Sequence, residues 1–313
     1  MRKATTLIVL FAALAAALPT ATATEVGVIL AGTVQVFWQA MSKGIKRAGQ
    51  DLHVDLVVRS PTDGAALGAQ DNVQLRMIDY MVQRGVAGIV LAPEPLTGVA
   101  TPVSVPMPMV LVDRGSADYN AIATVATDNL GAGRKAALSL VPVLRKGAKV
   151  AVLRLAASIS STTERETGFL SVAREQGWDV VVDTYVGFRF RESEELIAKA
   201  LTAHQGRLDA VFAPNETTAY GALRVVEAMP AGARPRLVAF DWRPEFLTAL
   251  KRGVLHAAVL QDPYRMGYLA VETLVAAKQG RTPPPRVFVD VATVTQANLN
   301  DAAIQAVLAS YSE

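Results

Sequence analysis

Side chains that form paired hydrogen bonds recur directly after short apolar runs of this chain. The run MVLV is followed by Asp113 and Arg114, and the run AVFAP by Asn215. Asp241 follows LVAF, and Gln261 follows HAAVL. Carboxylates, amides and guanidinium groups are planar and bond in a bidentate manner to groups such as neighbouring hydroxyls. Their repetition at one class of position predicts a binding site for a polyhydroxylated molecule.

Aromatic residues occupy the same class of position. Phe37 and Trp38 follow the first apolar run, Phe188 follows a later one, and Phe240 directly precedes Asp241. A sugar exposes flat apolar C–H faces beside its hydroxyls, and aromatic rings supply the matching surface. The combined pattern therefore favours a sugar site.

Each of these residues also has an ordinary structural interpretation. Asp113 and Asn215 are typical helix or turn caps, and Arg114 is typical of a surface ion pair. Phe37 and Trp38 are also typical core residues. The joint pattern, rather than any one residue, carries the prediction.

Short apolar runs alternate with amphipathic stretches from residue 25 onward, which predicts a parallel α/β protein. The strands are expected at 25–31, 54–59, 88–92, 109–113, 149–155, 179–186, 210–213, 236–240 and 256–261. Helices are expected at 37–52, 72–83, 130–144, 164–176, 192–204, 218–228, 244–252, 264–278 and 302–308. This number of strands is too large for a single sheet in one compact domain. We therefore expect two sheets in two similar lobes. Ligands of open α/β sheets bind at the carboxyl ends of the strands.

The first 23 residues resemble a secretory signal peptide. Arg2 and Lys3 precede an uninterrupted apolar run, 7–18, and Ala21-Thr22-Ala23 offers a small-residue cleavage site. An uncleaved anchor helix is the alternative, but the run is short for a membrane span. Cleavage is expected after Ala23, which gives a periplasmic protein.

The charge, cysteine and histidine content of the chain argues against several kinds of partner and of chemical site. Of the 31 basic residues, Arg2 and Lys3 leave with the signal, so 29 face 28 acidic residues and the mature chain carries a charge of +1. No nucleic-acid partner is expected. The chain has no cysteine, so neither a disulfide nor a lipid-modified cysteine is available. The three histidines are scattered without ligand spacing, so no metal or other cofactor is expected.

Seven segments of the chain, taken together, resemble the type 1 periplasmic binding proteins, close to the ribose-binding group. The resemblance rests on FWQAMSKGIKRAG, VLVDR, TDNLGAG, RETGF, LDAVFAPNE, LVAFD and LQDPYRMG, in this order and spacing. It implies two Rossmann-like lobes, each a parallel sheet flanked by helices, joined by three crossing segments near 127, 261–263 and 290. The predicted N-terminal lobe is then 24–126 with 263–290, and the C-terminal lobe 127–262 with 291–313.

The resemblance also implies a set of ligand-binding residues. These are Gln35, Phe37, Trp38, Asp113, Arg114, Arg165, Phe188, Asn215, Phe240, Asp241 and Gln261. Phe37 and Trp38 would stack on one face of the sugar and Phe188 on the other, while Phe240 would help to wall the pocket. Gln35 stands where ribose binders place asparagine, and Trp38 where they usually place phenylalanine. Both departures put ribose itself in doubt, but not a monosaccharide.

The implied mechanism is closure of the two lobes on a monosaccharide, with delivery to an ABC-transporter permease and, as an open alternative, recognition by a chemoreceptor. We expect a monomer. A non-sugar solute read by a sensor partner is the main alternative function. Paired action of Asp113 and Asp241 on a glycoside is the enzymatic alternative, for which nothing else in the sequence speaks. We therefore expect no enzyme.

Two further alternatives are disfavoured. A transcription regulator of the same fold would carry an N-terminal helix-turn-helix where this chain has its signal sequence. Gly131, Gly133 and Ala136 match a loose dinucleotide pattern, but helix packing after an Asp128 cap explains these residues better. The tail beyond 291 has no functional interpretation from sequence.

Overall fold

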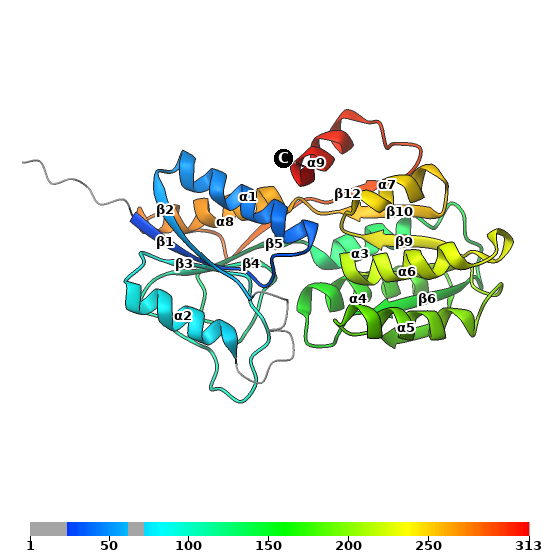
Figure 1. Ribbon diagram of the computed structural model, residues 1–313, viewed down its shortest axis with the longest axis horizontal. Helices are drawn as coiled ribbons and strands as arrows, with labels where there is room; N and C mark the ends of the chain where they lie inside the picture. The colour runs from blue at the N-terminus through cyan, green and yellow to red at the C-terminus, as the bar shows by residue number, and fades with distance from the viewer. Residues whose placement is uncertain (1–23, 62–71, 313) are drawn as a thin grey trace, which may run out of the picture.

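The protein consists of two lobes that lie side by side (Figure 1). The structure, a computed structural model, describes residues 24–61 and 72–312. The predicted signal peptide, 1–23, lies outside the described residues. Among residues 24–61 and 72–312, none of the helices combines the length and the apolar composition that a membrane span requires.

The N-terminal lobe is built on a six-stranded sheet of order β11-β5-β4-β3-β1-β2, and all neighbouring strands pair in parallel. Its strands are β1 (Thr24–Ile29), β2 (Val54–Arg59), β3 (Ile89–Leu91), β4 (Met109–Asp113), β5 (Ala123–Thr127) and β11 (Arg286–Val289). Its helices are α1 (Val36–Asp51), α2 (Val73–Arg84) and α8 (Pro263–Lys278).

The C-terminal lobe repeats this arrangement with the order β12-β10-β9-β8-β6-β7, in which only β12 is antiparallel to its neighbour. Its strands are β6 (Lys149–Arg154), β7 (Asp179–Tyr185), β8 (Ala210–Phe212), β9 (Arg236–Phe240), β10 (Leu255–Leu260) and β12 (Ala292–Val294). Its helices are α3 (Asn129–Leu138), α4 (Ser160–Glu175), α5 (Phe190–Thr202), α6 (Glu216–Ala228), α7 (Pro244–Lys251) and α9 (Ala302–Ser312), with a 3₁₀ turn at Ala231–Ala233.

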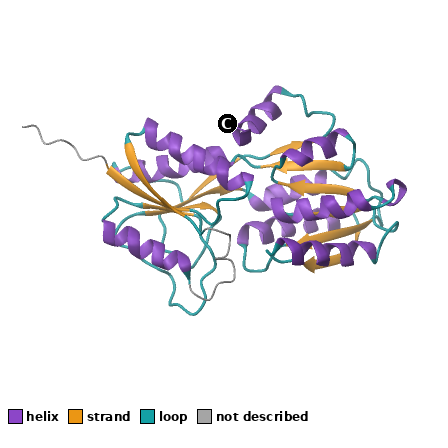
Figure 2. Cartoon of the chain, viewed as in Figure 1, coloured by secondary structure: helices purple, strands orange, loops and turns teal. Residues whose placement is uncertain are grey.

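Both sheets are covered by helices on both faces, which explains why their central strands are almost continuously apolar (Figure 2). Successive side chains of a strand point to opposite faces. Val28 of β1 therefore packs in the cluster that contains Met41 of α1 and Leu274 of α8, whereas Ile29 packs with Met81 of α2. The prediction of two α/β lobes is confirmed.

The chain passes between the two sheets three times, at β5–α3, at β10–α8 and at β11–β12. The resemblance implies crossings near 127, 261–263 and 290, at the same places in the chain. These crossings place the carboxyl ends of both sheets at the boundary between the lobes, which is where open α/β sheets bind their ligands.

Three strands were not expected from sequence: β5, β11 and β12. β5 reads ATVAT, and β12 has only three residues, so neither gives an apolar run long enough to stand out. β11 alternates exposed and buried residues at the edge of its sheet. Each is defined by pairing with a neighbour rather than by its own composition.

Three predicted helix boundaries differ from the structure by four residues or more: the end of α3, the start of α4 and the end of α9. α3 ends at Leu138, where the hydroxyl of Ser139 donates to the Ala136 carbonyl (2.6 Å), instead of continuing to 144. α4 begins at Ser160, four residues before the predicted start. Its first turn is rich in Ser and Thr, and Thr163 bonds back to the Ile159 carbonyl (3.1 Å), so these residues fit a helix terminus despite their modest helix propensity.

The C-terminal helix α9 lies above the boundary between the lobes and contacts both α1 and β12 (Figure 1). It extends further than the predicted helix at 302–308. Ile304 and Tyr311 pack in one apolar cluster with Ala40 of the N-terminal lobe and Trp242 of the C-terminal lobe. The buried Tyr311 hydroxyl donates to the backbone carbonyl of Gln261 (3.0 Å). The tail thus covers one of the three crossings.

Candidate functional site

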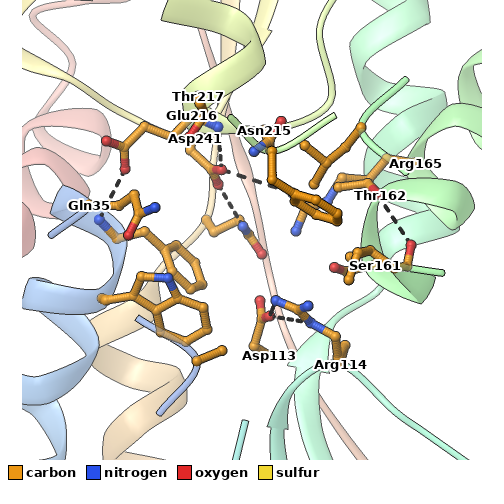
Figure 3. A pocket seen from close by; sticks show the side chains of 17 residues that line it. Gln35, Asp113, Arg114, Ser161, Thr162, Arg165, Asn215, Glu216, Thr217 and Asp241 are labelled. Carbon is orange, nitrogen blue, oxygen red and sulfur yellow. Dashed lines mark hydrogen bonds and ion pairs between the residues drawn. The ribbon is translucent and has the colours of Figure 1, made fainter. Parts of the chain in front are cut away.

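A cavity of about 140 Å³ lies between the lobes (Figure 3). On the same measure a single water needs roughly 10–15 Å³, so the cavity has room for a small organic molecule. Residues of both lobes line it: Ala31, Gln35, Phe37, Trp38, Asp113, Arg114, Leu155, Ile159, Ser161, Thr162, Arg165, Phe188, Asn215, Glu216, Thr217, Asp241 and Gln261.

Ten of the eleven residues of the predicted ligand-binding set lie in this lining: Gln35, Phe37, Trp38, Asp113, Arg114, Arg165, Phe188, Asn215, Asp241 and Gln261. Phe240 does not. Its side chain is fully buried in the core beneath α3 and α4. Phe240 is the last residue of β9, and its ring packs among the buried residues of this core rather than in the cavity lining.

Asp113 and Asp241 occupy equivalent places in the two lobes. Asp113 ends β4 and Asp241 follows β9, and these two strands hold the same position in the two sheet orders. Both residues have left-handed backbone, with φ of 74° and 68°. Aspartate tolerates this region better than most residues, and such strained positions concentrate at functional sites. The fold therefore delivers one carboxylate from each lobe.

Asp241 is the centre of a buried hydrogen-bond network. Its Oδ1 accepts from the Gln261 amide (2.6 Å), and its Oδ2 accepts from the Glu216 backbone N–H (2.9 Å). Thr127 in turn donates to the Gln261 side-chain oxygen (2.7 Å), which joins two of the three crossings. Burial raises the pKa of Asp241, while Arg165 and Gln261 act in the opposite direction. The site is thus tied directly to the segments that connect the lobes.

Arg165 is held rigidly from three sides. Its Nε donates to Asn129 (2.8 Å) and its Nη1 to the Pro214 carbonyl (2.9 Å). Its guanidinium lies 4.0 Å from the ring centroid of Phe240 and 4.0 Å from the Asp241 carboxylate. Burial lowers the pKa of Arg165, an effect that the Asp241 charge opposes. Phe240 therefore supports the cavity by fixing a lining residue.

Asp113 and Arg114 form an ion pair on the opposite side of the cavity (Figure 3). Arg114 donates through Nε (2.7 Å) and Nη2 (2.5 Å) to one carboxylate oxygen, Oδ2. Both side chains are largely buried, at 11% exposed for Arg114 and 4% for Asp113. A carboxylate accepts through both oxygens, so Oδ1 remains suited to a ligand hydroxyl.

Phe37 and Trp38 form an aromatic wall at the start of α1. Their ring centroids are 5.0 Å apart at an interplanar angle of 87°, an edge-to-face pair. Trp38 lies so close to the β1–α1 loop that a Cβ on Gly32 would come within 2.7 Å of its ring. Gly32 thus allows a ring larger than phenylalanine here. Phe188 lines the cavity from the other lobe.

Sequence reasoning missed several lining residues, of which Glu216 is the most consequential. It is 3% exposed, and burial together with the nearby Asp241 charge raises its pKa to about 7. Its neighbour Asn215 has a buried Oδ1 without a hydrogen-bond partner among the described residues, which fits an atom reserved for a ligand. Ser161 and Thr162 were missed because the α4 start was placed too late. Inspection of the strand ends reaches Glu216, which directly follows Asn215 after β8, but the ligand set that the resemblance implies omits it.

The alternatives based on metal or dinucleotide binding gain no support. Within the described ranges, no group of three or more His, Cys, Asp or Glu side chains is placed to hold a metal ion. A Cβ on Gly133 would overlap the Arg165 carbonyl oxygen, so this glycine permits close packing of α3 on α4. Asp128 caps α3 by accepting from the Gly131 N–H (3.0 Å). The helix-packing interpretation is confirmed.

Comparison with known proteins agrees with this geometry. The ribose import binding protein RbsB of Haemophilus influenzae is 26% identical over 264 residues, covering 83% of this chain and 87% of that protein. RbsB of Bacillus subtilis is 28% identical over 240 residues, covering 75% of each. A carbohydrate transporter solute-binding protein from Agrobacterium radiobacter, solved with D-arabinose, superposes with a TM-score of 0.82 at 27% identity, covering 92% of this chain and 99% of that one.

These relatives are binding proteins rather than enzymes. This agrees with the expectation from the sequence that the chain is a binding protein. The resemblance to the type 1 periplasmic binding proteins of the ribose group is confirmed. The family described as periplasmic binding protein domain matches residues 26–282, and this chain belongs to it.

Proposed function

We propose that this protein captures one neutral monosaccharide, a pentose or hexose, in the cavity between its lobes and delivers it to the permease of an ABC transporter. One observation carries the proposal. A single cavity, lined from both lobes, combines planar hydrogen-bonding groups with aromatic rings. This mixture matches the hydroxyls and the apolar faces of a sugar ring.

The charges of the cavity favour a neutral ligand. Asp113 pairs with Arg114, Asp241 faces Arg165 at 4.0 Å, and Glu216 accepts from Arg243 (3.0 Å). A charged solute would leave one member of such a pair without compensation in a dry site, which is costly. A polyol hydroxyl can bond to a paired carboxylate or guanidinium without disturbing the pair.

Lobe closure provides the mechanism of capture. The lining residues come from both sides of the boundary, so a ligand contacts all of them only when the lobes are together. Such a ligand stabilises the closed state by its differential affinity. The predicted lobe boundaries, 24–126 with 263–290 and 127–262 with 291–313, place the moving parts on either side of the three crossings.

The relatives support the ligand class. The two RbsB proteins are named for ribose import, and the Agrobacterium protein was solved with D-arabinose. By analogy, the protein acts in the periplasm after cleavage behind Ala23, and the closed form is the species that a permease, or alternatively a chemoreceptor, recognises.

A thermal-shift panel on residues 24–313 tests this function. The panel contains pentoses, hexoses, polyols, amines and anionic solutes. A ligand at about 100 times its Kd adds about 2.7 kcal/mol to the free energy of unfolding, which raises Tm by several degrees. We expect such a shift with at least one monosaccharide. A shift with an amine or anion alone would instead support the sensor alternative.

A further inference from the structure

The N-terminus of α1, which carries the aromatic wall, has no cap from its own sequence. Gln35 occupies the N-cap position with extended backbone, but its side chain makes no capping hydrogen bond. No acidic residue lies in the first turn. The first N–H groups of a helix have no partner within the helix and need acceptors from elsewhere.

The acceptor comes from the other lobe. Oε2 of Glu216 accepts the backbone N–H of Phe37 at 3.3 Å, a contact between residues 179 positions apart in the chain. The Val36 N–H also stabilises the Glu216 carboxylate. Figure 3 shows Glu216 on the side of the cavity that faces the start of α1. A carboxylate suits this place because the helix dipole favours negative charge at an N-terminus.

Glu216 is anchored within its own lobe by bonds that do not depend on the lobes being together. Its Oε1 accepts from Arg243 (3.0 Å), and its backbone N–H donates to Asp241 (2.9 Å). Arg243 also contacts Glu245 and lies 4.2 Å from the Tyr220 ring centroid. Separation of the lobes would therefore break the bond to Phe37 and leave the remaining bonds in place.

We propose that Glu216 is a positioning residue that caps α1 across the lobe boundary, holds Phe37 and Trp38 against the ligand, and slows ligand release. The proposal rests on the proposed function, because it describes how the same cavity is kept closed. Glu216 itself need not contact the sugar. It affects binding by fixing the N-terminus of α1, the helix that carries Phe37 and Trp38.

The test compares Glu216→Ala, which removes the acceptor, with Glu216→Gln, which keeps a side-chain oxygen at the same reach. Glu227→Ala is the matched control, since Glu227 lies on the same helix and pairs with Arg252 (3.4 Å) on the surface. Ligand dissociation is followed by stopped-flow tryptophan fluorescence, with the monosaccharide that gives the largest thermal shift.

We expect Glu216→Ala to raise the dissociation rate constant about tenfold, the factor that corresponds to about 1.4 kcal/mol, with an association rate within twofold of wild type. Glu216→Gln should recover most of the loss, and Glu227→Ala should match wild type. The proposal is overturned if Glu216→Ala leaves dissociation unchanged, or if Glu216→Gln is as impaired as Glu216→Ala, since a capping oxygen would then not be what matters.

A second readout needs no ligand. The chain has no cysteine, so Gln50→Cys and Gln205→Cys introduce two unique spin-label sites, one on an exposed position of each lobe. Without sugar, Glu216→Ala should shift the interlobe distance distribution away from the closed form relative to Glu216→Gln. An unchanged distribution contradicts the cross-lobe cap, whereas failure of every monosaccharide to bind contradicts the proposed function and leaves this comparison intact.

Discussion

Replacing Asp113 by asparagine should weaken sugar binding strongly while the fold persists. Asparagine matches the shape of aspartate and also tolerates the left-handed backbone that Asp113 adopts, at φ 74°. Its amide oxygen can still accept from Arg114, as Oδ2 does now. The amide nitrogen then stands in place of the second carboxylate oxygen, and a donor faces the ligand hydroxyl where an acceptor was.

The magnitude follows from the loss of one charged acceptor in a buried site. The Asp113 side chain is only 4% exposed, so water cannot substitute for it. A hydrogen bond to a charged group contributes about 1.5–3 kcal/mol, which corresponds to an increase in Kd of about 10- to 150-fold. The free energy of unfolding should fall by about 1–3 kcal/mol, because Arg114 keeps a hydrogen bond to the amide oxygen but loses its buried counter-charge.

Isothermal titration of wild type and variant with the sugar identified in the panel measures the ratio of Kd values, and urea denaturation measures stability. Asp118→Asn is the control, since Asp118 lies in the same lobe outside the cavity and accepts from the Leu96 N–H (3.1 Å). A Kd within twofold of wild type for Asp113→Asn would refute its assignment to the ligand-binding set.

Three further predictions concern the aromatic wall, a buried acid and the tail. Trp38→Ala should weaken binding by about 1 to several kcal/mol through loss of an aromatic face, and an unchanged Kd would make Trp38 a core residue only. Burial raises the pKa of Glu94 to about 7, so its ionisation in the folded state costs about 3 kcal/mol at pH 8, and this cost is almost absent at pH 4, where both states are mostly protonated. Glu94→Gln should therefore raise the free energy of unfolding at pH 8 but not at pH 4, and equal variant effects at the two pH values would disprove this. Tyr311→Phe should destabilise the protein by about 1–3 kcal/mol, because the buried carbonyl of Gln261 loses its donor. A urea midpoint equal to that of wild type would show that the Tyr311 bond contributes nothing.

The fold could be predicted well wherever a strand is buried on both faces. β1, β4 and β9 read as apolar runs because helices cover both sides of the sheet. β11 and β12 could not be predicted in the same way, since an edge strand of three or four residues depends on hydrogen bonds to its neighbour rather than on its own composition.

The candidate site was predictable because parallel sheets bring their strand ends to one edge. The rule found Asp113, Asn215 and Asp241 without knowledge of the structure. It could not show that Phe240 packs in the core beside Arg165 instead of lining the cavity, because that depends on the direction of its side chain at the end of β9. Nor could it show that Glu216 contacts the start of a helix in the other lobe, which requires the relative placement of the two lobes, since Phe37 and Glu216 are 179 positions apart in the chain.

A crystal structure of residues 24–313 with the monosaccharide from the panel tests the central claim most directly. We predict one sugar per chain in the cavity between the lobes, with Asp113 and Asp241 at hydrogen-bonding distance from its hydroxyls and the rings of Trp38 and Phe188 against its faces. A sugar bound at saturation on the surface of a single lobe, with the cavity containing only water, would contradict the proposed capture between two lobes.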